Sequence, residues 1–181
     1  MRRIELTCYV EDPPSADVAV KLLEHVNESS SVGLAFKDGF PSNERGFGNI
    51  RKKMPGILKA AGHGLYYFVI TDLDKGACAP TLIREWLGMS ARDEIALPGA
   101  LVFRVAVREI EAWILADRGS LSKFLDIPID NFPLAPDDSA DPKQDLLNIL
   151  RRKGTKHWHK EMLPQGRLAS IGPLYNKKLC E

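Results

Sequence analysis

Apolar positions along this chain change their spacing several times, from short unbroken runs to helix-like stripes. Runs rich in β-branched and aromatic residues predict strands at 3–10, 31–37, 65–71 and 100–107. Apolar residues three or four positions apart predict helices at 15–28, 49–62, 79–88, 108–117, 120–125 and 143–154. The run at 65–71 is apolar on both faces, which is typical of a central parallel strand. This alternation of strands and helices predicts an α/β fold with an open, mainly parallel sheet flanked by helices.

A segment rich in Pro and Asp, residues 127–142, separates this alternation from the last part of the chain. With 181 residues, the chain is long enough for one domain with a substantial core and hardly long enough for two. We therefore predict an α/β core over residues 1–126. Residues 127–181 are predicted to form a loop and a small helical C-terminal extension that packs on this core.

Composition and charge exclude few functions, but they bear on where in the cell the protein works and on whether it associates with a membrane. Hydrophobic residues make up 44% and charged residues 27%, and the net charge of +1 does not by itself indicate a nucleic-acid or membrane partner. No apolar run approaches the roughly 18–20 residues that span a bilayer, and Glu5 interrupts the N-terminal apolar stretch. The three cysteines, Cys8, Cys78 and Cys180, fit neither a disulfide framework nor a zinc site. We expect a cytoplasmic protein with no membrane partner.

Acidic side chains follow three of the predicted strands. They are Glu11, Asp12, Asp72, Asp74, Glu109 and Glu111. In an open parallel sheet, the carboxyl ends of the strands share one edge, and ligands bind there. Carboxylates gathered at such an edge repel one another unless cations compensate them, and Mg²⁺ binds carboxylates together with water and substrate phosphates. The pattern therefore predicts an acidic metal site, and the alternative for Glu11 and Asp74 is an ordinary turn or cap position.

Two other kinds of site that use Asp-x-Asp fit this chain less well. An EF-hand calcium loop that starts at Asp72 requires Glu at its twelfth position, where the chain has Ile83. A phosphatase of the haloacid-dehalogenase type has Thr or Val two residues after the second Asp, where the chain has Gly76. The calcium loop is therefore excluded, and the phosphatase stays an outside alternative.

Three stretches of the chain together resemble the Toprim fold. They are "CYVEDPPSADVAVKLL", "YFVITDLDKGAC" and "VAVREIEAWILAD". Within that fold, the chain is most similar to a bacterial family of Toprim-like proteins that is distantly related to the OLD-family nucleases. The resemblance covers most of the chain, and the third stretch is its most distinctive part. One departure is Asp12, which stands where that family usually has Gly.

The resemblance implies both a metal site and a reaction. Toprim domains use a Glu after the first strand and an Asp-x-Asp after the third to hold Mg²⁺ or Mn²⁺, and they make or break phosphodiester bonds. Carried onto this chain, the implied metal ligands are Glu11, Asp72 and Asp74, followed by Glu111 and then Glu109. All of these except Glu109 are also the expected catalytic residues. Two ions about 4 Å apart in such a site activate a water and stabilise the leaving oxygen.

A basic stretch near the end of the sequence is a candidate nucleic-acid surface. Its candidate contacts are Arg151, Arg152, Lys153, Lys156, Trp158 and Lys160. The cations suit phosphates, and the indole suits stacking on an unpaired base. The alternative is an ordinary solvated face. The sequence has no P-loop, nucleophile elbow or dinucleotide glycine fingerprint, so ATP hydrolysis and hydride transfer by this chain are poorly supported.

We therefore expect a Toprim-type, Mg²⁺- or Mn²⁺-dependent nuclease, or a subunit of one, that acts on phosphodiester bonds. Family members are often encoded beside ATPases, so the resemblance also implies a partner ATPase in a defence or repair system. The main alternative is a catalytically silent Toprim-like subunit that binds such an ATPase. Nucleic acid is the other expected partner, and a homo-oligomer is left open.

Overall fold

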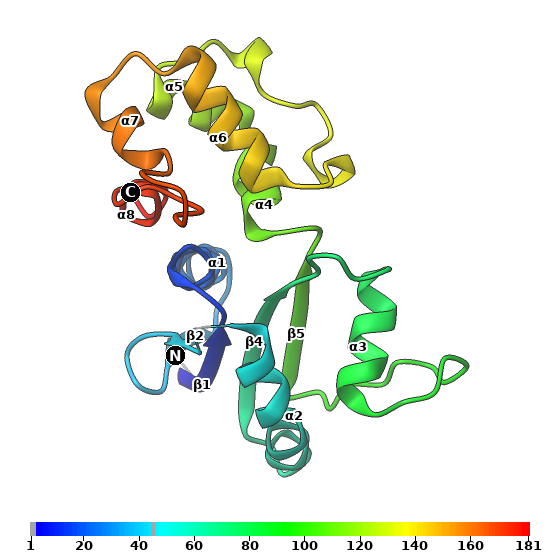
Figure 1. Ribbon diagram of the computed structural model, residues 1–181. Coiled ribbons are helices and arrows are strands. Elements are labelled where there is room, and N and C mark those ends of the chain that lie inside the picture. Colours follow the sequence, from blue (N-terminus) through cyan, green and yellow to red (C-terminus); the bar gives the residue numbers. More distant parts are fainter. Residues whose placement is uncertain (1–2, 45) are drawn as a thin grey trace. The chain divides into compact units, whose positions relative to one another are not determined.

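The chain divides between residues 105 and 106 into two compact units (Figure 1). The computed structural model describes residues 3–44 and 46–181. We call the two parts the first unit and the second unit, and each is described by itself. The predicted boundary after residue 126 lies further along the chain, so residues 106–126 belong to the second unit. The described residues include no helix with the length and apolar character needed to cross a membrane.

The first unit is built on a five-stranded sheet. Its strands are β1 (Arg3–Val10), β2 (Gly33–Phe36), β3 (Ser42–Asn43), β4 (Tyr66–Asp72) and β5 (Leu101–Ala106). The order is β2-β1-β4-β5, and β1 runs parallel to β2, β4 and the additional strand β3. The predicted α/β fold with a mainly parallel sheet is therefore confirmed. The prediction missed β3, because two residues are too few to show a periodicity.

Three helices flank this sheet, namely α1 (Pro13–Ser29), α2 (Phe47–Gly62) and α3 (Ala79–Leu87). The chain leaves β1 for β2 on one side and later returns past β1 to reach β4 on the other side. Right-handed crossovers therefore place α1 and α2 on opposite faces of the sheet. Helix α3 packs beside α2 (Figure 1). The ends of β1 and β4 and the starts of the helices that follow them therefore lie at one edge of the sheet, where a ligand is expected.

Burial in the first unit follows the predicted patterns more closely in α2 than in α1. The buried stripe of α2 consists of Ile50, Met54, Ile57 and Ala61. In α1 the buried residues are small, including Ala16 and Ala19, which let the helix approach the sheet closely. The larger residues Leu22 and Val26, whose spacing predicts the helix, are 40% and 41% exposed. The spacing of apolar residues thus located α1 correctly but not its buried face.

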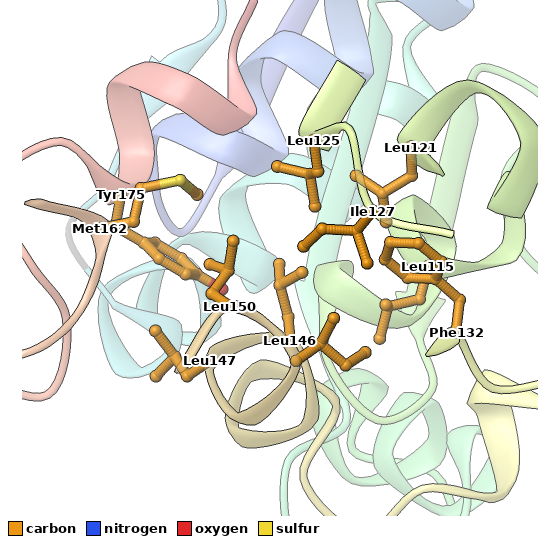
Figure 2. Close-up of a cluster of buried hydrophobic side chains, with 11 residues drawn as sticks. Leu115, Leu121, Leu125, Ile127, Phe132, Leu146, Leu147, Leu150, Met162 and Tyr175 are labelled. Atoms are coloured by element: carbon orange, nitrogen blue, oxygen red, sulfur yellow. The ribbon is translucent and has the colours of Figure 1, made fainter. Parts of the chain in front are cut away.

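The second unit is helical. Its elements are α4 (Ile110–Ala116), α5 (Arg118–Leu125), the 3₁₀ helices Ile129–Asn131 and Pro136–Asp138, α6 (Pro142–Lys153), α7 (His157–Met162) and α8 (Tyr175–Leu179). One cluster of buried apolar side chains forms its core (Figure 2). Ile127 and Phe132, from the segment predicted as a loop, belong to this cluster. That segment is therefore part of the folded unit and not a linker.

Candidate metal centre

The ends of β1 and β4 bring carboxylates of the first unit to one edge of the sheet. The two strands are neighbours, with Tyr9 opposite Val69. Continuing this register by two residues places Glu11 opposite Thr71, next to the last residue of β4. The edge therefore forms because two neighbouring parallel strands end at the same level.

Glu11 is held at this edge by two hydrogen bonds. Its Oε1 accepts one from the Thr71 hydroxyl and one from the backbone N–H of Asp72, the latter at 3.0 Å. Burial raises the pKa of the Glu11 carboxyl, and the negative charges of Asp74 and Asp12 raise it further, although the two hydrogen bonds oppose this. No described Lys or Arg forms an ion pair with Glu11. The Glu11 carboxylate thus lies near the like charges of Asp74 and Asp12, and no Lys or Arg among the described residues is paired with it.

Asp12 has a structural task at the same edge, because it caps α1. Its Oδ1 accepts a hydrogen bond from the Ser15 N–H at 2.9 Å. Its backbone, with φ −148° and ψ 171°, is extended, a conformation open to any residue. The Gly that the resembled family carries here is therefore not required by the backbone of this chain. We leave Asp12 out of the candidate ligands because its carboxylate is engaged in the cap.

Asp72 and Asp74 lie on either side of the start of the turn that follows β4. Asp72 is 6% exposed, whereas Asp74 is exposed and has φ 49°, in the left-handed region that Asp tolerates. The Gly76 N–H closes the turn on the Leu73 carbonyl at 2.8 Å. A Cβ at position 76 would lie 2.8 Å from Leu73 Cδ1 and 2.9 Å from the Leu73 carbonyl oxygen, so the turn requires Gly. The residue that departs from the phosphatase motif is therefore explained by the shape of this turn.

The carboxylates at this edge suit a cation that keeps several water ligands better than a cation enclosed by protein ligands alone. Within residues 3–44 and 46–181, no three His, Cys, Asp or Glu side chains meet as a set of metal ligands. Mg²⁺ usually keeps several waters and takes only one or two carboxylates from the protein. Glu11 and Asp72 supply two such residues from neighbouring strands, and the Asp72 backbone N–H donates a hydrogen bond to Glu11 Oε1 at 3.0 Å. Asp74 is the exposed third carboxylate, close enough to raise the pKa of Glu11.

A fourth carboxylate, Glu44, lies beside the same strand end and was not predicted. Its backbone N–H donates to the Val10 carbonyl at 2.8 Å. Its Oε1 accepts a hydrogen bond from the Ser42 hydroxyl at 2.8 Å and pairs with Lys53 Nζ at 2.7 Å. Burial alone would raise the pKa of Glu44, but the hydrogen bonds from Lys53 and Ser42 lower it overall. No pattern in the sequence pointed to Glu44, because a loop residue belongs to no periodic run.

Glu109 and Glu111 are engaged inside the second unit. Glu111, on α4, is fully buried, and its Oε1 accepts a hydrogen bond from the Tyr175 hydroxyl at 3.0 Å. Lys143 Nζ lies 3.4 Å from Glu111 Oε1 and 3.9 Å from Glu109 Oε1, and the Lys143 N–H donates to Glu109 Oε2 at 3.0 Å. Burial raises the pKa of Glu111, although the charge of Lys143 opposes this. These two carboxylates therefore share one cation within the second unit.

The first three residues of the predicted nucleic-acid surface lie on the last turn of α6. Arg151, Arg152 and Lys153 are all exposed. Arg151 donates to the Asn148 side chain at 2.7 Å, and Arg152 Nε donates to the Asn148 carbonyl at 3.2 Å. Cations at the C-terminal end of a helix also interact favourably with the helix dipole. This position alone accounts for the charge run, so no nucleic-acid partner is needed to explain it.

The other three predicted residues lie around α7, and the indole among them is packed. The half-buried Trp158 ring has its centroid 5.5 Å from that of Phe124 and 4.3 Å from that of His159. Lys156 Nζ lies 5.7 Å from the Trp158 ring centre and donates to the Phe124 carbonyl at 3.3 Å. Lys160 is exposed. Only part of the indole surface is therefore left for a base to stack on.

Comparison of the chain with protein-family models, with curated proteins and with solved structures gave no match. The candidate function therefore depends on the contacts of Glu11 and Asp72 and on the charges around them. Those contacts are internal to the first unit and involve described residues only.

Proposed function

We propose that the first unit binds a divalent cation, Mg²⁺ or Mn²⁺, at the ends of β1 and β4 and uses it to cleave phosphodiester bonds. The observation that supports this proposal is the hydrogen bond from the Asp72 backbone N–H to the Glu11 carboxylate, with no basic side chain of the described residues paired to Glu11. A carboxylate among like charges lowers its electrostatic energy by taking up a cation. In this proposal Glu11 and Asp72 hold the ion, and Asp74 is the third carboxylate at this edge.

The residues around the ion would set its position and supply a base. The Thr71 hydroxyl and the Asp72 N–H both donate to Glu11 Oε1, which leaves Oε2 for the ion. When bound, Mg²⁺ or Mn²⁺ polarises the phosphate and lowers the pKa of a bound water. Asp74 is exposed and lies within electrostatic range of Glu11, so it is the carboxylate best placed to accept a proton from water.

We leave Glu109 and Glu111 out of the proposed metal site. Lys143 lies 3.9 Å and 3.4 Å from their carboxylates, and Glu111 is fully buried with Tyr175 as a hydrogen-bond donor. A carboxylate that already shares a cation gains little from a second one. The proposed catalytic set is therefore smaller than the one that the family resemblance implies.

We further propose that the protein is a Toprim-type nuclease or nuclease subunit in the cytoplasm, with an ATPase partner in a defence or repair system. The three sequence stretches that resemble Toprim proteins support this wider assignment. Nucleic acid is the proposed substrate, because its phosphodiester backbone is the group that such a metal site attacks.

Cleavage assays with Asp72→Ala test this function. Plasmid and single-stranded DNA are incubated with Mg²⁺ or Mn²⁺, and we expect Asp72→Ala to lose roughly 100-fold or more of the wild-type rate, because the metal contributes several kcal/mol to the barrier. Glu24→Ala, which removes an exposed carboxylate from α1, is the matched control and should keep the full rate. Metal-dependent activity that survives Asp72→Ala unchanged would overturn the assignment.

A catalytically silent interaction subunit is the second candidate. It is favoured by the observation that no three potential ligands meet within the described residues. In that case the free protein should bind neither Mg²⁺ nor Mn²⁺ in a calorimetric titration, and it should bind a partner ATPase without cleaving DNA. Turnover of a generic phosphomonoester that is lost in Asp72→Asn would instead indicate the dehalogenase-type phosphatase.

A further inference from the structure

Every charged residue of helix α2 is cationic. Its charged residues are Arg51, Lys52, Lys53 and Lys59, and it has no Asp or Glu. Because successive residues turn by about 100° around a helix, the buried stripe from Ile50 to Ala61 directs Lys52 and Lys59 to the opposite, solvent-facing side. These two lysines are seven residues apart, which corresponds to about 10 Å along the axis.

This face begins next to the candidate metal centre. The Gly46 N–H, just before α2, donates to the Glu11 carbonyl at 3.2 Å. Arg51 and Lys52 are the fifth and sixth residues of the helix, roughly 6–8 Å along its axis from the first residue. A chain of phosphates lying on the outward side of α2 would therefore lead towards the strand end that carries Glu11.

The cations of α2 differ in how far they are already neutralised. Lys53 Nζ pairs with Glu44 at 2.7 Å and lies 4.6 Å from the centre of the Tyr9 ring. Arg51 and Lys52 are exposed and form no ion pair with any described acidic residue. Their charge is therefore available to a ligand from solution, whereas that of Lys53 stabilises the first unit internally.

The solvent-facing side of α2 is also unusually bare. Gly48, Gly56 and Gly62 are exposed helical glycines, and an added Cβ would meet nothing within 4 Å at any of them. Gly56 lies in the helix interior, where glycine costs about 1 kcal/mol relative to Ala, and packing inside the protein does not require it there. Because Gly48, Gly56 and Gly62 have no side chain, an extended ligand backbone can come close to the helix at these positions. The charge of the cations, and not the exposed glycines, is what would attract a ligand to this face.

We infer that the outward face of α2, with Arg51, Lys52 and Lys59, binds the phosphodiester backbone of a nucleic-acid strand. Repeating negative charge matches a row of cations that no carboxylate of the same helix interrupts. The inference rests on the proposed function in one respect: a strand bound there would be the substrate presented to the carboxylate edge. This inference assigns the nucleic-acid surface to the first unit, whereas the sequence predicted it at residues 151–160.

Binding of fluorescently labelled single-stranded and double-stranded DNA, measured by anisotropy in EDTA over a series of salt concentrations, tests this surface. We expect the double variant Arg51→Glu/Lys52→Glu to bind at least about 10-fold more weakly than wild type. Its dependence of log K on log salt should be shallower by roughly two, because two phosphate contacts are lost. The matched control is Arg151→Glu/Arg152→Glu, which changes the net charge equally and should keep affinity within about two-fold.

Several outcomes would overturn the inference. They are equal affinity of the α2 variant and wild type, a larger loss in the control, and no salt-dependent binding by wild type. Binding of an acidic protein but not of DNA through α2 would assign the surface to a protein partner and also overturn it. If the charge-reversed protein does not fold, as judged by circular dichroism, Arg51→Gln/Lys52→Gln provides the same comparison with a smaller expected loss.

The two proposals fail in distinguishable ways, because this binding is measured without metal. If Asp72→Ala abolishes cleavage while the α2 variant binds DNA normally, the surface is wrong and the proposed function stands. If the α2 variant loses binding while wild type cleaves nothing with any divalent metal, the surface stands and the proposed function fails.

Discussion

Glu11 in the first unit and Glu111 in the second are carboxylates of the same kind in opposite electrostatic surroundings. Burial raises the pKa of both. The charged neighbours that affect Glu11 are Asp74 and Asp12, whereas Glu111 has Lys143 Nζ at 3.4 Å. The second unit therefore compensates its buried acid with its own cation. The first unit has no such cation for Glu11 among its described residues, which is why we propose an ion from solution as its partner.

This difference separates a structural carboxylate from a candidate ligand. Removing the cation of a buried pair leaves an uncompensated charge, which is costly. A carboxylate that lacks a cation gains when a metal ion binds. Mutations in the two units should therefore have different effects. Those that remove the cation in the second unit should lower stability, and those that remove a carboxylate in the first unit should weaken metal binding.

The largest expected effect on stability comes from Lys143→Met, which removes the cation shared by Glu109 and Glu111. Breaking a buried pair costs about 3–5 kcal/mol, and since the Lys143 side chain is 30% exposed, we expect a loss of about 2–3 kcal/mol in the free energy of unfolding. Chemical denaturation measures this loss. Lys153→Met, at the exposed end of the same helix, should change stability by less than about 0.5 kcal/mol. A loss no greater than that of the control would contradict the claim that Lys143 compensates the charges of Glu109 and Glu111.

Two substitutions that each remove one hydroxyl donor test the difference between Glu111 and Glu11. Tyr175→Phe removes a donor from the fully buried Glu111 and should lower the free energy of unfolding by about 1–2 kcal/mol. Thr71→Val removes a donor from the half-buried Glu11, which keeps the Asp72 N–H, so the expected loss without metal is below about 1 kcal/mol. Thermal or chemical unfolding in EDTA measures both. A larger loss for Thr71→Val would mean that Glu11 is the more structural of the two.

The pH dependence of the second unit gives a smaller, directional test. Because the pKa of Glu111 is raised in the folded state above its ordinary value of 4.5, its contribution to stability is fully present below that value. That contribution is lost as the pH rises through the raised pKa. Glu111→Gln removes the titration, so the unfolding free energy of wild type minus that of the variant should fall as the pH rises from 4.5 through the raised pKa. A difference that stays constant or grows with pH would show that burial does not raise this pKa.

Local patterns were sufficient to predict most of the fold. The strand that ends at Asp72 is apolar on both faces, and the carboxyl ends of parallel strands meet at one edge, so Glu11 and Asp72 were expected at the same edge. The structure adds that their two strands are neighbours. What the patterns missed is short or depends on shape. The two-residue strand β3 has no periodicity, and α1 buries Ala16 and Ala19 because small residues pack closely on a sheet.

The role of Glu111 could not be read from the sequence in the same way. It follows a strand just as Glu11 does, which is why both were expected in one metal site. Its partners, Lys143 and Tyr175, come from α6 and α8, far along the chain, and only the folded second unit brings them together. Long-range pairing of this kind leaves no local signal, so the distinction between the two carboxylates required the structure.

Calorimetric titration of Mn²⁺ into wild type, Asp72→Ala and Glu111→Gln tests the central claim most directly. We expect wild type and Glu111→Gln to bind the ion with similar affinity, because Glu111 is already compensated by Lys143. Asp72→Ala should bind at least about 10-fold more weakly, because one of two carboxylate ligands is lost. Equal binding by wild type and Asp72→Ala, or a loss confined to Glu111→Gln, would contradict the assignment of the metal site to the ends of β1 and β4.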